Sequence, residues 1–149
     1  MTDPARMETP VEIARRLPEG CAVIYRHFGK PEKAQALRDL TRAQNRQLLI
    51  GNDPELARDI GADGVHFSRD ENLSAPIAWR KKQPDWILTM AGLKHGAYLA
   101  PLDSLDALFI SSLFPSRSPS AGEPIGTAAL KDTAARLPIP IFALGVFSF

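Results

Sequence analysis

Residues 48–67 read LLIGNDPELARDIGADGVHF, and this stretch decides the class of fold. The apolar run at 48–50 is followed by Asn52, Asp53 and Pro54, which predict the start of a helix, and Gly61 predicts its end. A second short apolar run, 64–67, comes directly after that turn. A strand, a helix and a second strand joined this tightly are typical of an α/β protein with a parallel sheet.

The same alternation continues on both sides of this stretch. Each apolar run is short and bounded by Gly, Pro, Asn or Asp, as expected of strands that are covered on both faces. Helices are expected to begin at a capping box of Thr9 and Glu12, at Pro31, at Asn52, at Ser74 and at Thr127. We expect strands at 22–25, 48–50, 64–67, 86–89, 107–110 and 139–144, with Cys21 a buried strand residue.

Helical periodicity also predicts which side chains face the core. In the first helix these are Val11, Ile13, Ala14 and Leu17. In the second and third helices they are Leu37, Leu40, Ala43, Leu56, Ala57 and Ile60.

Composition limits the kind of protein. The chain has 149 residues, 44% of them apolar, so we expect one domain, residues 1–149. Its 18 basic and 17 acidic residues are scattered, which does not favour nucleic acid as a partner. No apolar run approaches the roughly 20 residues of a membrane span, and the N-terminus lacks the pattern of a signal peptide. A cytoplasmic protein that binds small molecules is the expectation.

The number of strands leaves two architectures open, an open doubly wound sheet and an incomplete barrel. Length by itself favours the open sheet, because a complete (β/α)8 barrel rarely takes fewer than about 200 residues. We expect the chain to be truncated at both ends, because a helix precedes the first predicted strand and no helix follows the last one.

In either architecture ligands bind at the carboxyl ends of the strands. The residues there are cations, carboxylates and a loop rich in Ser and Gly, which together suit a phosphate or pyrophosphate held with Mg²⁺. Simpler roles stay open: Asn52 and Asp53 are good N-cap residues, His27 and His95 can be solvated, and Asp63 can make local hydrogen bonds. The candidates are Arg26, Asn52, Asp53, His66, Asp70, Glu71, His95, Ser116, Ser118 and Gly145.

Four segments of the chain match the sequence pattern of one known family. The stretch 48–71, which ends GADGVHFSRDE, is similar to "liINDr.dLA...gADGVHLGQeD" of the thiamine-phosphate synthase and TenI-like family. VIYRH at 23–27 resembles its "vqlRe" strand, FISSLFPSRS at 109–118 its "fiGPvFpT.S" loop, and IPIFALG at 139–145 its "iPvvAiGG" strand. The segments keep their order over nearly the whole chain.

The resemblance implies a (β/α)8 barrel that lacks part of strand one and the region after strand seven. It also implies a transferase that joins a hydroxymethylpyrimidine diphosphate to a thiazole phosphate, with Mg²⁺ at the pyrophosphate. Catalytic roles carry over to Arg26, His95 and Ser116. Substrate or phosphate binding carries over to Arg26, Asn52, His66, Ser116, Ser118 and Gly145, and metal binding to Asp53, Asp70 and Glu71.

The chain also departs from the family pattern. The family's Gln, Lys and loop Lys are Ile24, Phe28 and Pro119 here, and an alignment without a gap moves the "IND" pair onto Gly51 and Asn52. Three alternatives to the synthase are therefore open: a phosphate-ligand binding or regulatory protein, a relative of the thiazole tautomerase, and a non-functional fragment. A homo-oligomer is a further expectation.

Overall fold

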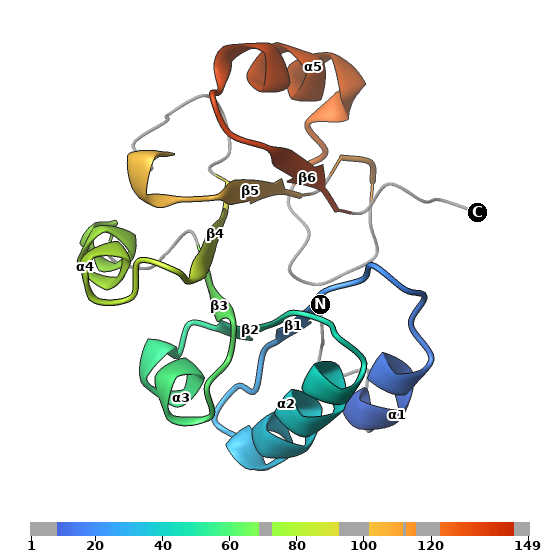
Figure 1. Cartoon of the computed structure of the whole chain (residues 1–149). Coiled ribbons are helices and arrows are strands. Elements are labelled where there is room, and N and C mark those ends of the chain that lie inside the picture. The colour runs from blue at the N-terminus through green and yellow to red at the C-terminus, as the bar shows by residue number, and fades with distance from the viewer. Residues whose placement is uncertain (1–8, 69–72, 93–101, 112, 116–122, 145–149) are drawn as a thin grey trace. The chain divides into compact units, whose positions relative to one another are not determined.

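The computed structural model describes residues 9–68, 73–92, 102–111, 113–115 and 123–144, and it is an α/β protein (Figure 1). The strands are β1 (Val23–Tyr25), β2 (Leu48–Gly51), β3 (Gly64–Phe67), β4 (Ile87–Ala91), β5 (Ala107–Ile110) and β6 (Ile141–Ala143). The α-helices are α1 (Pro10–Arg15), α2 (Ala34–Ala43), α3 (Pro54–Asp59), α4 (Ser74–Lys82) and α5 (Gly126–Arg136), with 3-10 helices η1 (Pro31–Lys33) and η2 (Leu102–Ser104).

The sheet has six strands in the order of the sequence, and its described pairings are parallel. Along the chain a helical segment follows each of the first five strands (Figure 1). The predicted class of fold and parallel sheet are therefore confirmed. The longest described helix, α5, has 11 residues, and within the described ranges no helix has the length and hydropathy of a membrane span.

The chain divides into two compact units. Unit 1 is Met1–His66 with Asp85–Ile87, and its core is built on Leu37, Leu48, Ile50 and Val65, all fully buried. Gly64 belongs to this unit, and a Cβ there would lie 1.9 Å from the carbonyl oxygen of Ile87, so only glycine fits. Unit 2 is Phe67–Pro84 with Leu88–Phe149, and its core includes the buried side chains of Leu88, Met90, Leu108 and Phe67.

Strand positions are predicted well, with differences at the ends. The strand expected at 86–89 is Ile87–Ala91, and the last strand is Ile141–Ala143 rather than 139–144. Cys21 is half-buried and lies before β1, so the prediction of a buried strand residue is wrong.

Helix α3 has the start and the end that its sequence predicts. Asp53 is the N-cap residue, and its side chain accepts a hydrogen bond from the Leu56 N–H. At the other end Gly61 has φ 63°, and the N–H groups of Gly61 and Ala62 donate to the carbonyls of Arg58 and Ala57. This is the Schellman pattern, which uses glycine because the left-handed conformation costs it nothing.

The capping box expected at α1 is not formed. Thr9 is the N-cap residue of α1, but its side chain makes no capping hydrogen bond. Ile13 is 43% exposed, so its predicted place in the core is wrong, while Ala14 is buried. Arg46 instead holds the end of α1, because its guanidinium donates to the carbonyl oxygens of Ala14 and Leu17.

The buried face of α2 is more polar than the apolar pattern predicts. Leu37 is buried as expected, but Ala43 is exposed and Leu40 only half-buried, and Arg38 and Thr41 take the buried positions. The Thr41 hydroxyl donates to the carbonyl of Arg38 at 3.1 Å, which satisfies it inside the protein. The buried guanidinium of Arg38 pairs with an aspartate that directly precedes β3.

That aspartate is Asp63, which directly precedes β3 and binds the first residue of β2, Leu48. Its Oδ2 accepts hydrogen bonds from Arg38 Nη1 and from the Leu48 N–H, both at 2.7 Å. Its own N–H donates to the Leu48 carbonyl at 2.9 Å. Asp63 is therefore structural, but the prediction that its hydrogen bonds are local is wrong.

Unit 2 repeats this arrangement with different residues. Asp106 Oδ2 accepts from Arg80 Nη2 at 2.6 Å and from the Leu88 N–H at 2.7 Å. The Asp106 N–H donates to the Leu88 carbonyl at 2.8 Å. We call each arrangement an aspartate clamp: Asp63, Arg38 and Leu48 in unit 1, and Asp106, Arg80 and Leu88 in unit 2.

Candidate functional site

The carboxyl edge of unit 1 places three residues in one row across β1, β2 and β3. Tyr25 pairs with Ile50, so Arg26, which follows β1, is level with Gly51 at the end of β2. Gly51 in turn pairs with His66 in β3. Residues at one level of a parallel sheet share a face, so Arg26 and His66 lie on the same side with a glycine between them.

Gly51 makes room for the side chain of Arg26. A Cβ at Gly51 would lie 2.8 Å from Arg26 Cγ and 3.4 Å from Arg26 Cα. The stem of Arg26 therefore passes over the position that a larger residue at 51 would fill. A guanidinium supplies fixed N–H donors that match phosphate oxygens, so this edge suits an anion.

His66 is a buried histidine beside that cation, with only 5% of its surface exposed. Burial, and next the charge of Arg26, lower the pKa of His66 to about 4. The ring is therefore neutral at pH 7, and it can donate one hydrogen bond and accept another without adding charge. The sequence predicted a site role for His66, and the structure places it next to the predicted arginine.

Asn52 continues the edge beyond β2. Its φ is 55°, in the left-handed region that Asn tolerates better than most residues, and its N–H donates to the His66 carbonyl at 3.0 Å. The Asn52 side chain is exposed at the carboxyl edge. Asn52 is thus a predicted site residue that directly follows Gly51 in the chain and is hydrogen-bonded to the backbone of His66.

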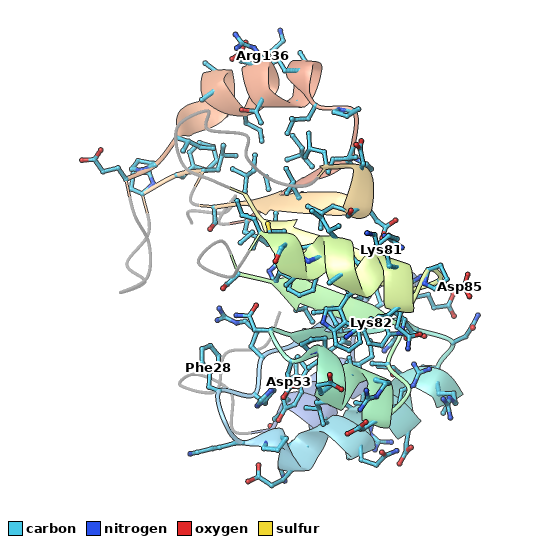
Figure 2. All side chains as sticks on the ribbon, turned by 90° about the vertical axis from the view of Figure 1, so that its left-hand side faces the viewer. Phe28, Asp53, Lys81, Lys82, Asp85 and Arg136 are labelled. Atoms are coloured by element: carbon cyan, nitrogen blue, oxygen red, sulfur yellow. The ribbon has the colours of Figure 1, made fainter. Side chains whose placement is uncertain are left out.

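Asp53 has both carboxylate oxygens engaged. Oδ1 accepts from the Leu56 N–H at 2.9 Å, and Oδ2 lies 3.1 Å from His27 Nε2. In Figure 2 Asp53 and Phe28, which adjoins His27, lie in the same part of the molecule. The capping role anticipated from Asn52, Asp53 and Pro54 is confirmed for Asp53.

Sequence reasoning missed the role of His27, which it treated by default as a solvated histidine. The side chain is 14% exposed, and both ring nitrogens have partners: Nε2 the Asp53 carboxylate, Nδ1 the Gly29 N–H at 3.1 Å. These partners fix the tautomer, because Nδ1 accepts and Nε2 therefore donates. No motif signals this pair, since Asp53 lies in the next βα unit of the chain.

Phe28 is exposed at the same edge. The residue is 63% exposed, its φ is 47°, and the guanidinium carbon of Arg26 lies 4.8 Å from the ring centroid. A left-handed conformation is uncommon for a bulky residue, and such strain collects at functional sites. The contact is a cation–π pair that orients the guanidinium.

In unit 2 the chain after β4 and after β5 begins with a small residue. Gly92 follows β4 and Ser111 follows β5. The other predicted site residues, Asp70, Glu71, His95, Ser116, Ser118 and Gly145, lie outside the described residues, and so does Pro119.

Three carboxylates are the expected ligands of Mg²⁺. Of Asp53, Asp70 and Glu71, only Asp53 is described, and its oxygens serve the α3 cap and His27. Across the described ranges, no three His, Cys, Asp or Glu side chains gather as metal ligands. The described residues by themselves do not form a magnesium site.

This arrangement belongs to a known class of α/β protein. A solved structure of thiamine phosphate pyrophosphorylase from Pyrococcus furiosus superposes with a TM-score of 0.72 over 97% of this chain and 72% of that one. Its sequence is 21% identical, so the likeness defines the fold.

The sequence comparisons then give the family. Residues 29–148 match the family model described as thiamine monophosphate synthase, and the chain belongs to that family. A thiamine-phosphate synthase of Chlorobium phaeovibrioides is 32% identical over 145 residues, which is 91% of this chain and 69% of that protein. A thiamine-phosphate synthase of Moorella thermoacetica is 34% identical over 116 residues, 76% of this chain and 55% of that protein. The predicted family is confirmed, and the chain spans between about half and about two thirds of the length of these relatives.

Proposed function

We propose that the carboxyl edge of unit 1 is the pyrophosphate subsite of a thiamine-phosphate synthase. In this proposal the protein joins a phosphorylated pyrimidine, as its diphosphate, to a thiazole phosphate and releases pyrophosphate. The observation that carries it is the row of Arg26, Gly51 and His66, in a family whose named members are thiamine-phosphate synthases. The six-stranded sheet is then part of a (β/α)8 barrel.

Arg26, Asn52 and His66 each have a role in this proposal. Arg26 donates hydrogen bonds to the pyrophosphate, where negative charge increases as the bond to the pyrimidine breaks. Asn52 offers an exposed amide next to it, and His66 remains neutral, so it can hydrogen-bond without repelling the guanidinium. Roles for His95, Ser116, Ser118 and Gly145 in binding or catalysis, and for Asp70 and Glu71 in holding Mg²⁺, complete the proposal.

Turnover tests the synthase directly. The folded protein is mixed with the pyrimidine diphosphate, the thiazole phosphate and Mg²⁺, and thiamine phosphate is measured. We expect product with the natural sequence and a loss of roughly 10²-fold in kcat/KM for Arg26→Ala, because one charged donor to the leaving group is removed. Arg58→Ala is the control, since Arg58 is exposed in α3 and pairs with Glu55 and Asp59. Absence of product from the folded natural sequence would reject the transferase.

One observation favours a second candidate, a phosphate-ligand binding protein without turnover. Phe28, an exposed ring, stands where the family pattern has a Lys, so the edge has one cation fewer for a leaving pyrophosphate. Calorimetry separates the two candidates. Binding of thiazole phosphate or thiamine phosphate without turnover supports the second candidate, and no binding of either rejects it.

A further inference from the structure

The turn after β1 contains two consecutive left-handed residues. Phe28 has φ 47° and Gly29 has φ 80°. Glycine adopts this conformation easily, but phenylalanine does so only where its surroundings hold it there. The contacts of the turn must therefore determine its shape.

His27 makes most of those contacts. Its carbonyl accepts from the Lys30 N–H at 2.9 Å, and its Nδ1 accepts from the Gly29 N–H at 3.1 Å. Tyr25 closes the turn from the strand, because its hydroxyl donates to the Lys30 carbonyl at 2.8 Å. His27 thus joins the two ends of the Phe28–Gly29 turn.

His27 also anchors the turn to the next βα unit. Its Nε2 lies 3.1 Å from Asp53 Oδ2, and Asp53 is itself fixed by the Leu56 N–H at the start of α3. A helix N-cap is a rigid point, so the imidazole is held at one side by a helix and at the other by the turn. The pair is partly buried, with 14% of the His27 side chain and 34% of the Asp53 side chain exposed.

We propose that His27 is a positioning residue for Arg26: by fixing the turn to Asp53, it holds the Phe28 ring under the Arg26 guanidinium and so directs that guanidinium toward a phosphate or pyrophosphate. Arg26 and Phe28 are two residues apart and their groups are 4.8 Å apart, so a change in the turn moves the ring away from the cation. This rests on the proposed function, because it takes Arg26 as the anion ligand.

Two substitutions separate positioning from simple stability. His27→Gln keeps an N–H at about the position of Nε2 and can still reach Asp53. His27→Ala removes both side-chain contacts, the one with Asp53 and the one with the Gly29 N–H. Calorimetry with sodium pyrophosphate, at a temperature where circular dichroism shows each variant folded, should give a roughly tenfold weaker Kd for His27→Ala, the effect of about one lost hydrogen bond. We expect His27→Gln to remain within about threefold of the natural sequence. Gln35→Ala is the control, because Gln35 is exposed in α2 and hydrogen-bonds Asp39.

A second readout does not need a ligand. Ring current from Phe28 should shift the side-chain protons of Arg26 upfield in the NMR spectrum, and Phe28→Leu gives the position without a ring. We expect the shift to persist in His27→Gln and to fall toward the Phe28→Leu value in His27→Ala. If His27 only stabilised the fold, His27→Ala would lower the melting temperature and leave the Arg26 shift unchanged.

The outcomes distinguish the two proposals. Natural pyrophosphate affinity together with a natural Arg26 shift in His27→Ala would overturn the role of His27 and leave the proposed function intact. Absence of pyrophosphate binding by the natural sequence would reject the anion subsite, while the Arg26 shift would still decide whether His27 fixes the guanidinium.

Discussion

His66 shows how a single buried residue makes stability depend on pH. The pKa of His66 falls to about 4 in the folded protein, against an ordinary value near 6.5 when the chain unfolds. The folded state therefore favours the neutral ring. Its contribution is complete above about pH 6.5 and is lost as the pH falls from there toward about 4, because the unfolded state takes up the proton first.

This gives a prediction for acid unfolding. Between pH 7 and pH 4 the free energy of unfolding should drop by about 3 kcal/mol through His66 alone. Urea titrations at several pH values measure it, with His66→Gln as the comparison, since that variant should show a drop smaller by this amount. Parallel curves for the two proteins would show that His66 does not carry the effect.

At the residue scale the sequence locates the site better than it explains it. Arg26, Asn52 and His66 could be predicted because each stands at or just beyond the end of an apolar run. The pairing of His27 with Asp53 could not be predicted, because nothing in the sequence of either loop indicates that the two side chains are in contact. The same holds for Asp63, whose partners Leu48 and Arg38 are 15 and 25 residues away.

At the element scale the strands could be predicted, but the buried faces of the helices only in part: Ala14, Leu37 and Ala57 are buried as expected, while Ile13 and Ala43 are exposed. The runs at 48–51, 64–67 and 107–110 are apolar and end at polar or glycine residues, so their positions follow from composition alone. In α2 the buried positions include Arg38 and Thr41 because each has a hydrogen-bond partner inside the protein. Periodicity of apolar residues cannot anticipate a buried polar group whose partner lies in another element.

Each aspartate clamp joins a helix to the start of a strand by polar contacts, so its loss should be costly. Asp63→Ala should lower the free energy of unfolding by about 3 kcal/mol, because it leaves Arg38, whose side chain is 10% exposed, and the Leu48 N–H without their partner. Asp106→Ala should cost less, about 1 to 2 kcal/mol, because the Arg80–Asp106 pair is more exposed, at 25% and 48%.

Chemical denaturation measures both effects. Asp59→Ala is the matched control, because Asp59 is 64% exposed and should change the free energy of unfolding by less than about 0.5 kcal/mol. A cost for Asp63→Ala no larger than that of the control would contradict the clamp.

At the scale of the whole molecule, a ligand of the proposed subsite should stabilise the folded chain. Pyrophosphate at 100 times its Kd should raise the free energy of unfolding by about 2.7 kcal/mol, because it binds the folded state only. Thermal melting with and without pyrophosphate measures the gain. Arg26→Ala should abolish it and Arg58→Ala should retain it. An equal gain in both variants would mean that the anion binds elsewhere.

The two clamps also have a kinetic meaning. In each unit one aspartate binds both the N–H and the carbonyl of a leucine, Leu48 in unit 1 and Leu88 in unit 2, and it draws an arginine from a helix to the same point. Neither leucine amide can exchange its hydrogen with solvent until its hydrogen bond to the aspartate breaks. The Leu48 and Leu88 amides therefore report opening at one point in each unit, so the exchange rates of two protons show which unit opens more readily.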